Sequence, residues 1–249
     1  MTSVESDLSG VTYNPSTGTL FAINNGDRII YEIEFPNTLL QTWNVSEYTL
    51  DLEGISAMGG RSFAITDENP SSISTLILNA DGSVSNVTKI FSGFEAAGFA
   101  PAGNNLGFEG VTYLKSLGNA TSTSISRQAE TGKFIAVQEA SPTRIWSFDE
   151  ATTVIEPLTD DLKLASPNAI WSSGGLTRGG DATNEVFVLA KIYEGEGFDG
   201  ESYFQKGVFR YDLDSGEFTE HFGAGVCNMG QPEGKPRAAL QPFFFSVFL

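Results

Sequence analysis

A recurring two-residue step, a serine or glutamate followed by glycine, constrains this chain more than any other feature of its sequence. The step opens similar stretches at several places. They are Leu8-Ser9-Gly10-Val11-Thr12-Tyr13, Leu52-Glu53-Gly54-Ile55-Ser56, Phe108-Glu109-Gly110-Val111-Thr112-Tyr113 and, more loosely, Ser172-Ser173-Gly174-Gly175-Leu176-Thr177, with a fifth opening at Pro232-Glu233-Gly234. The openings are about 44 to 64 residues apart, close to the roughly 40 to 50 residues of a propeller blade.

Three further strand-like runs follow each of the first four openings. The second runs are continuously apolar, the third alternate with polar residues, and the fourth are the most polar. They are 20–23, 62–65, 134–137 and 186–190, then 29–35, 73–78, 144–148 and 208–213, then 39–45, 87–91, 153–158 and 218–222. Continuous apolar runs suit strands buried on both faces, and alternation suits strands nearer a rim. The pattern predicts an all-β fold, a β-propeller of four-stranded blades.

A β-sandwich is the alternative, since it also uses short strands and tight turns, but it has no reason to repeat one dipeptide at every fourth strand. The five openings predict five blades, or six if terminal sequence is missing. We expect the propeller domain to span 1–234, with openings near 9, 53, 109, 173 and 233. Residues 235–249 lack the strands of a full blade, so we expect an incomplete last blade and interpret this tail as truncated or translated in a wrong frame.

Composition narrows the classes of partner. Fourteen basic residues against 31 acidic ones give a formal net charge of −17, which disfavours nucleic acid and anionic membrane surfaces and favours cations, calcium above all. Cys227 is the only cysteine, which excludes an intramolecular disulfide and a cysteine-based zinc site. His221, the only histidine, lies in a predicted rim strand, and no G-x-S-x-G elbow occurs, so nucleophilic catalysis has little support.

Signals of compartment are mixed. The sequons at Asn44, Asn86 and Asn119 are compatible with secretion, although such sequons are common by chance. The first nine residues carry neither the basic nor the apolar region of a signal peptide. The apolar end at 243–249 is too short to span a bilayer.

Three glutamates of the openings are candidate metal ligands. In a propeller, the first strand of each blade lines the central channel, so Glu53, Glu109 and Glu233 should face one another, with Ser9 and Ser173 at the other two positions. Converging carboxylates repel one another unless a divalent cation joins them, and calcium accepts six to eight oxygen ligands. The alternative is a strut in which each glutamate accepts hydrogen bonds from backbone N–H groups of the neighbouring blade. The following glycine fits either interpretation, because it allows close backbone approach or unusual dihedral angles.

A second set of polar residues follows the second runs. Because adjacent strands are antiparallel, this set could lie at the same mouth of the central channel as the three glutamates. As candidate ligand-binding residues we select Asn24, Asn25, Asp67, Glu68, Glu139 and Lys191. The alternative is a set of solvated turns. The acidic stretch from Tyr193 to Tyr203 is either a lid over a ligand or the tip of a flexible hairpin.

These motifs resemble the SdiA-regulated (YjiK-like) β-propeller family. The resemblance rests on the order of the openings, with Asp67-Glu68 and Gln138-Glu139 after the second strands, and covers roughly residues 7 to 234. It implies a propeller related to calcium-dependent, phytase-like or esterase-like propellers, with a central cation site and an extracytoplasmic or secreted setting. The extra glycine of the fourth opening and the broken last blade depart from the pattern.

We therefore expect a calcium-binding propeller that binds a small-molecule or polymeric ligand at its channel mouth. Metal-dependent hydrolysis of phosphate or carboxyl esters is compatible with this, because calcium can polarise an ester oxygen without histidine. No catalytic residue is identified. The alternatives are a non-catalytic scaffold that binds a protein or glycan, and a structural or sensor protein with calcium-linked stability.

Overall fold

The computed structural model describes residues 8–95, 98–99, 106–115, 132–139, 143–150, 154–160, 162, 165–172, 185–196 and 202–223. The regular structure in these residues is entirely β-strand, in four antiparallel sheets of four strands. The first two sheets hold β1 (Leu8–Asn14), β2 (Thr19–Asn24), β3 (Ile29–Glu34), β4 (Thr38–Asn44), β5 (Leu52–Gly59), β6 (Ser62–Asp67), β7 (Ser72–Leu78) and β8 (Val84–Phe91).

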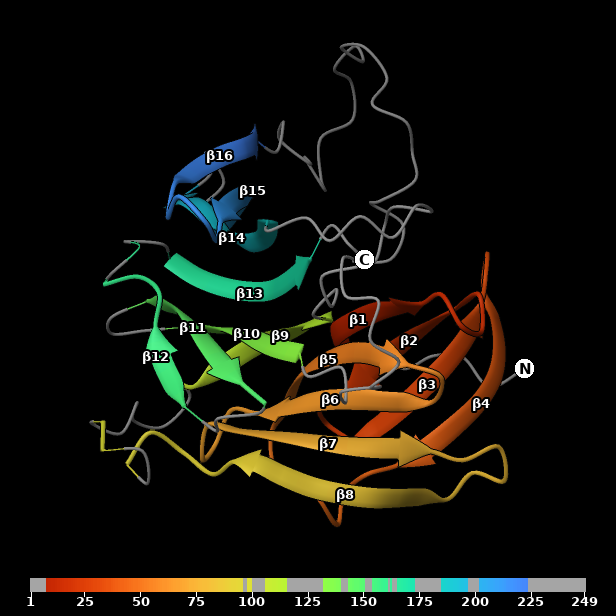
Figure 1. The fold of residues 1–249 in the computed structure, drawn as a ribbon. Helices are drawn as coiled ribbons and strands as arrows, with labels where there is room; N and C mark the ends of the chain where they lie inside the picture. The colour runs from red at the N-terminus through yellow and green to blue at the C-terminus, as the bar shows by residue number, and fades with distance from the viewer. Residues whose placement is uncertain are drawn as a thin grey trace, which may run out of the picture.

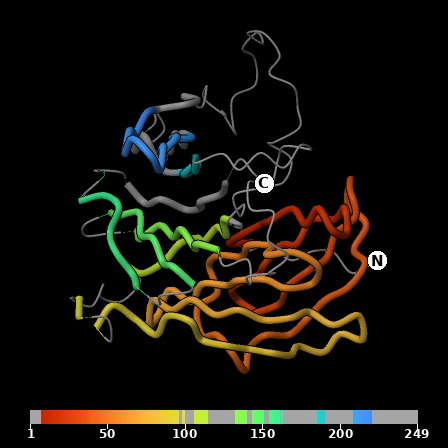
Figure 2. The backbone as a smooth tube through the Cα atoms, viewed as in Figure 1, coloured from red at the N-terminus to blue at the C-terminus, as the bar shows by residue number. Residues whose placement is uncertain are grey.

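The other two sheets hold β9 (Phe108–Lys115), β10 (Gly132–Gln138), β11 (Arg144–Asp149), β12 (Ile155–Pro157), β13 (Ala165–Ser172), β14 (Glu185–Glu196), β15 (Ser202–Asp212) and β16 (Phe218–Gly223). Within every sheet the strands follow one another in chain order. The first strands β1, β5, β9 and β13 contact one another in succession. Figure 1 shows the sheets following one another around a centre, and the same path is visible as a tube in Figure 2. The predicted β-propeller of four-stranded blades is confirmed.

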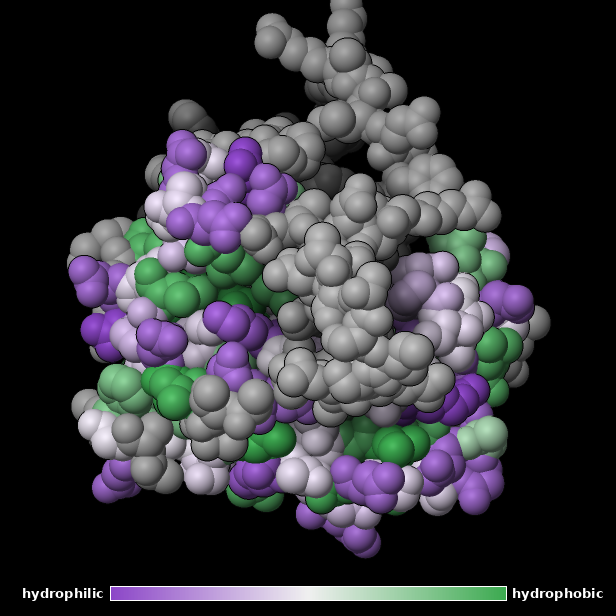
Figure 3. All heavy atoms as spheres, viewed as in Figure 1, coloured by the Kyte–Doolittle hydropathy of each residue, from purple (hydrophilic) through white to green (hydrophobic). Residues whose placement is uncertain are grey.

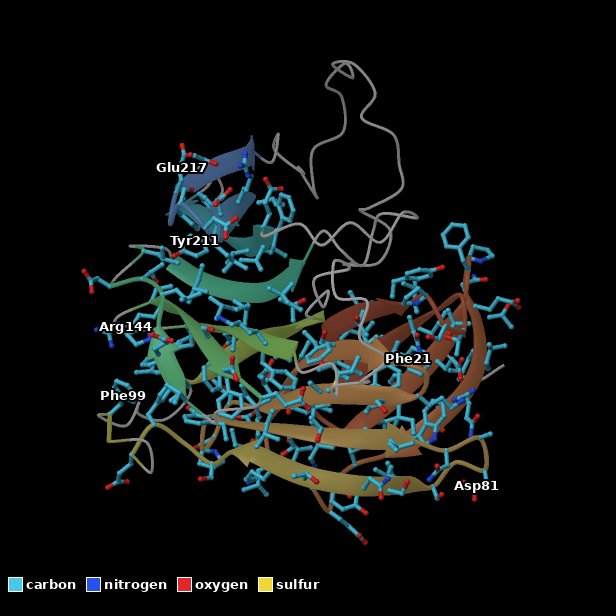
Figure 4. The ribbon with its side chains drawn as sticks, viewed as in Figure 1. Phe21, Asp81, Phe99, Arg144, Tyr211 and Glu217 are labelled. Carbon is cyan, nitrogen blue, oxygen red and sulfur yellow. The ribbon has the colours of Figure 1, made fainter. Side chains whose placement is uncertain are left out.

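The hydrophobic core lies between neighbouring blades. Phe21 of the first blade packs on Phe63 of the second with ring centroids 4.5 Å apart, and Figure 4 labels Phe21 in this position. Phe94 packs on Trp146 between the second and third blades at 4.8 Å. A smaller cluster joins the third and fourth blades. Each fully buried aromatic side chain contributes on the order of 2 to 3 kcal/mol, so these contacts hold the blades together.

Burial falls from the second to the fourth strand of a blade, as the run composition predicts. In β2 five of six residues are buried, whereas β4 alternates exposed with less exposed positions and only Trp43 in it is buried. Turn residues such as Asp81 and Glu217 lie at the outer edge, away from the centre (Figure 4). On the face drawn in Figure 3, hydrophilic residues lie around the periphery with hydrophobic ones between them. This gradient fits sheets whose outer strands face solvent.

The opening expected near residue 173 is wrong, because the first strand of the fourth blade is β13, which ends at Ser172. Its sequence, ASPNAIWS, carries a proline and few large apolar residues, so it has no strong strand pattern. Pro167 lies at an irregularity of the ladder between β13 and β14, a place where a strand tolerates proline. The expected fifth opening with Glu233, and the tail 235–249, lie outside the described residues.

The described residues of the acidic stretch from Tyr193 to Tyr203 lie at the far end of the hairpin made by β14 and β15. The ladder between β14 and β15 runs as far as Glu196 opposite Ser202, and the tip between them lies outside the described residues. Among the described residues no helix is long and apolar enough to cross a membrane.

Candidate metal centre

An irregularity at the start of each inner strand positions the residue before the glycine. The ladders between first and second strands skip one residue between Leu8 and Gly10, between Leu52 and Gly54, and between Phe108 and Gly110. The skipped residues are Ser9, Glu53 and Glu109. A bulge of this kind re-aims a side chain out of the regular alternation.

The glycines of the first two steps, Gly10 and Gly54, are required by close packing of neighbouring inner strands. A Cβ atom on Gly54 would lie 2.8 Å from the Cα atom of Gly110, and one on Gly10 would lie 2.9 Å from the carbonyl oxygen of Glu53. Neither glycine has a positive φ angle. Of the two explanations for the glycine, close backbone approach is therefore the right one.

The ends of the second strands lie at the same mouth as these bulges. Asn24, Asp67 and Gln138 are the cross-strand partners of the first residues of β1, β5 and β9. The next residues along the chain are Asn25, Glu68 and Glu139. Their backbones extend the ladder to the first strand of the same blade, because Glu68 N donates to Asp51 O at 2.8 Å and Glu139 N donates to Gly107 O at 3.0 Å.

An amide meets acids between the first two blades. Asn25 Nδ2 donates to Asp51 Oδ1 at 2.9 Å and also donates to Glu53 Oε1, while its Oδ1 accepts the backbone N–H of Leu52 at 3.1 Å. Glu53 is thus braced against the neighbouring blade, by a side-chain amide where the strut interpretation expected backbone N–H groups. The amide nitrogen lies between two carboxylates and reduces their mutual repulsion.

Between the second and third blades, carboxyl groups lie close to one another, and no amide of a described residue lies between them. Burial, followed by repulsion from Glu53, Glu68 and Glu139, raises the pKa of Glu109 to about 9. Burial, followed by the charge of Asp51, raises the pKa of Glu68 to about 7. Carboxyl groups in such surroundings are costly to ionise unless a cation is present.

A glycine also makes room for Glu68. A Cβ atom on Gly107 would collide with the carbonyl oxygen of Glu68, which in turn accepts hydrogen bonds from the backbone N–H and hydroxyl of Ser71 at 2.7 and 3.0 Å. The turn after β6 is thereby held against the start of β9. This fixes the position of the Glu68 side chain beside Glu109.

In the part of the chain that the structure describes, two groups of three carboxylates have the spacing of a metal site. Asp51, Glu53 and Glu68 each offer one oxygen within 4.8 Å of the others, and so do Glu68, Glu109 and Glu139. Glu68 is only 5% exposed, and its buried Oε1 atom has no hydrogen-bond partner. A buried carboxylate oxygen without a donor, surrounded by other carboxylates, is suited to a hard divalent cation. The donor set fits calcium.

Sequence reasoning missed Asp51. It lies one residue before β5, and the equivalent position of the third blade is Gly107, so the residue does not recur with the openings. The only available signal was an acid immediately before the Leu52-Glu53-Gly54 step.

Asn24 and Asp67 make contacts that brace turns. Asn24 Oδ1 accepts the backbone N–H of Asp27 at 2.7 Å, and the Asp67 carboxylate accepts those of Leu50 and Asp51 at 3.1 and 3.0 Å. Burial raises the pKa of Asp67 above its usual value. Asn24, Asp67 and Glu68 are all buried, so the solvated-turn interpretation is wrong for them. Their assignment as ligand-binding residues stays a prediction.

The remaining candidates are placed only in part. Lys191 pairs through its backbone with Ala165 and Lys206, which puts it in β14 at the position that Asp67 holds in β6. Glu233 and Ser173 lie outside the described residues.

Comparison with known proteins gives one family and several similar folds. A model of the family described as SdiA-regulated matches residues 1–169. Solved structures with a similar fold include "Kuenenia stuttgartiensis Hydrazine Synthase" (14% identity, TM-score 0.43, 88% of this chain and 51% of that one). Others are "Crystal structure of Nidogen/Laminin Complex" (13%, 0.49, 85% and 78%) and "Streptogramin B lyase structure" (14%, 0.45, 90% and 72%). The chain thus spans about half the length of the first of these. At such identities the likeness concerns the fold alone.

Proposed function

This chain belongs to the SdiA-regulated family, and from that premise we propose that its propeller binds a divalent cation, calcium in particular, at the channel mouth and holds a ligand through that ion. The ligands of the cation are carboxylates from the starts of inner strands and from the turns after second strands. They are Asp51, Glu53, Glu68, Glu109 and Glu139.

The observation that carries this proposal is the Oε1 atom of Glu68, which is buried and has no hydrogen-bond partner. An unsatisfied buried carboxylate oxygen costs free energy in the folded protein, at least about 1 to 3 kcal/mol. A cation at this position would remove that cost and would offset the burial and the repulsion that together raise the pKa of Glu109 to about 9.

The donor chemistry favours calcium over zinc and magnesium. The two groups consist of carboxylates alone, whereas zinc prefers nitrogen and sulfur ligands. Two oxygens on opposite sides of a calcium ion lie about 4.8 Å apart, since each is about 2.4 Å from the metal. Magnesium needs a tighter octahedral shell and keeps more of its water.

A bound calcium ion would give the mouth its chemistry. Protein carboxylates fill part of its coordination shell, and the positions that face the mouth would take an oxygen of a phosphate or carboxyl ester. We propose in addition that the bound ion promotes hydrolysis of such esters. The competing function, a scaffold without catalysis, is supported by the hydrogen bonds from Asn25 to Asp51 and Glu53, which brace two blades without any ion.

Calcium titration tests the proposal. We expect calcium to raise the melting temperature of chelator-treated protein by about 5 to 10 °C at a concentration 100-fold above its dissociation constant. Glu109→Gln should abolish most of this shift, whereas Asp81→Asn, which changes an exposed acid in an outer turn, should leave it intact. An equal calcium response in wild type and Glu109→Gln would overturn the proposal.

A second assay divides hydrolase from scaffold. Phytate and p-nitrophenyl esters are incubated with the protein in the presence of calcium and of chelator. Calcium-dependent turnover that Glu68→Gln removes would support hydrolysis. Tight calcium binding without turnover of either substrate class would favour the scaffold.

We also propose an extracytoplasmic or secreted setting, where calcium reaches the millimolar range that weaker sites require. The sequon residues Asn44 and Asn86 are both exposed. On expression through a eukaryotic secretory pathway, a glycosidase should reduce the mass of the wild type and leave an Asn44→Gln, Asn86→Gln variant with a smaller change. No change in wild-type mass would count against this setting.

A further inference from the structure

The two groups of carboxylates at the mouth are distinct and share one residue. Asp51 and Glu53 form one group with Glu68, and Glu109 and Glu139 form the other with the same residue. We propose that the mouth holds two divalent cations side by side, with the carboxylate of Glu68 bridging them. This inference rests on the proposed function, because it presupposes that the mouth binds cations.

Glu68 has the position that a bridge requires, and one of its oxygens has lone pairs that no hydrogen bond uses. Its side chain is nine-tenths or more buried, it belongs to both groups, and its Oε1 atom has no hydrogen-bond partner. A carboxylate has two oxygens and can bind one cation with each. In two-metal sites of proteins the ions lie about 3.5 to 4 Å apart, a separation that one bridging carboxylate spans.

The charge of the mouth also fits two ions better than one. With its five carboxylates ionised, the cluster would keep a formal charge of −3 around a single divalent ion and of −1 around two. Residual like charges in a partly buried cluster repel strongly, because the local dielectric is lower than that of water. A second cation removes most of this repulsion without any basic side chain.

The two halves differ in their donors, so the two ions should bind with different affinities. In the first half, Asn25 donates hydrogen bonds to Asp51 and Glu53, which use lone pairs that a metal would otherwise take. The second half has no such amide among the described residues, and the buried Oε1 atom of Glu68 has no hydrogen-bond partner, so its lone pairs stay available to a metal. We expect the half with Glu68, Glu109 and Glu139 to fill first.

Stoichiometry tests the inference directly. The full chain is freed of metal with a chelator and titrated with calcium by calorimetry in about 0.15 M KCl, which screens weak surface binding. We expect two ions per chain with unequal affinities. One ion per chain overturns the inference and leaves the proposed function standing, whereas no bound ion overturns both.

Matched variants show which of the two groups of carboxylates holds each ion. Asp51→Asn should lose the weaker ion and Glu139→Gln the tighter one, while Glu68→Gln should lose one ion and weaken the other at least tenfold. Asp81→Asn is the control and should keep two. A stoichiometry of two that neither Asp51→Asn nor Glu139→Gln changes would place the second ion elsewhere and overturn the bridge.

A spectroscopic measurement on the unaltered protein covers the case in which a variant does not fold. Terbium replaces calcium at oxygen sites, and a second lanthanide bound a few ångströms away quenches its emission by energy transfer. With terbium and europium supplied together, we expect efficient transfer. Terbium binding without transfer would contradict adjacent ions.

Discussion

Asn25 and Glu68 occupy equivalent positions in successive blades, each directly after the second strand and against the first strand of the next blade. Asn25 meets Asp51 and Glu53, and its amide donates to both. Glu68 meets Glu109: burial and the charges of Glu53 and Glu68 raise the pKa of Glu109, while burial and the charge of Asp51 raise the pKa of Glu68. Between the first and second blades, hydrogen bonds within the protein therefore offset the negative charge of the acids. Between the second and third blades, only bound protons or a cation can offset it.

The raised pKa values of Glu109 and Glu68 predict how the stability of calcium-free protein depends on pH. A carboxyl group whose pKa is raised on folding binds protons more tightly in the folded state. The free energy of unfolding is then highest below about pH 4.5, the ordinary value, and decreases as the pH rises through about 7 for Glu68 and about 9 for Glu109. Urea unfolding with chelator, from pH 5 to about 9, measures this decrease.

The variant Glu109→Gln should reduce the slope of stability against pH over that range, because the amide does not ionise. Asp81→Asn is the control: hydrogen bonds from Ser83 lower the pKa of Asp81, so it stays ionised over the whole range in both states. A slope that Glu109→Gln leaves unchanged would mean that other groups cause it.

The amide of Asn25 can be tested by replacing it with a carboxylate. In Asn25→Asp, the two hydrogen bonds to Asp51 and Glu53 become repulsions, and we expect calcium-free protein to lose about 2 to 4 kcal/mol at pH 8. Asn25→Ala loses only the hydrogen bonds and should cost less. Calcium should recover more of the loss in Asn25→Asp than in Asn25→Ala, and equal recovery in the two variants would contradict this account.

The strands show what repetition in a sequence can and cannot predict. The second, third and fourth strands of the first three blades lie close to the predicted runs, because their apolar residues recur in the same order. In the fourth blade, β14 extends six residues beyond its predicted run and β15 begins six residues before its own. The first strand of the fourth blade was mistaken because a glycine-rich stretch after β13 imitates the opening, whereas β13 itself carries Pro167 at its ladder irregularity.

For the candidate site too, the sequence predicted the residues that recur with the repeat but not the contacts between blades. Glu53 and Glu109 recur with the openings, so their shared mouth follows from the repeat. Whether an acid meets an amide or another acid depends on contacts between blades, which place Asn25 on Glu53 and Glu68 beside Glu109. These contacts cross from one repeat to the next, and a pattern read within one repeat does not contain them.

Close packing of the inner strands gives a prediction about Gly54. A Cβ atom there would collide with the hydroxyl of Thr66 in the same blade, and it would lie 2.8 Å from Gly110 Cα and 3.0 Å from Val111 N, both backbone atoms that cannot move independently. Gly54→Ala should therefore cost about 2 to 3 kcal/mol by urea unfolding, as overpacking does.

The comparison variant for Gly54→Ala is Gly18→Ala in an outer turn, where a Cβ meets nothing within 4 Å and only the positive φ of 73° is unfavourable. We expect it to cost about 1 kcal/mol and to leave calcium binding unchanged. A larger loss for Gly18→Ala than for Gly54→Ala would argue against contact between the inner strands as the reason for the glycine.

The blades are held by cores at their mutual interfaces, while their charges act over the whole molecule. Each described blade contacts its neighbours through one apolar cluster, as repeated units commonly do. A formal net charge of −17 opposes this compact arrangement by repulsion, most strongly at the mouth, where carboxylates from different blades come together. Two kinds of relief are available, general screening by salt and specific binding of a cation.

Salt and calcium can be separated because they act at different concentrations. Raising KCl from about 10 to 150 mM shortens the Debye length from about 30 to 8 Å, so the melting temperature of chelator-treated protein should rise in the wild type and in Glu109→Gln alike. Calcium at about 1 mM adds little ionic strength, yet it should raise the melting temperature further in the wild type even in 150 mM KCl, because it occupies a site instead of screening. In Glu109→Gln the response to KCl should persist and most of the response to calcium should vanish. If 150 mM KCl removes the calcium response of the wild type, calcium acts on this molecule only as a counterion, and the acidic mouth is a source of repulsion without a resident cation.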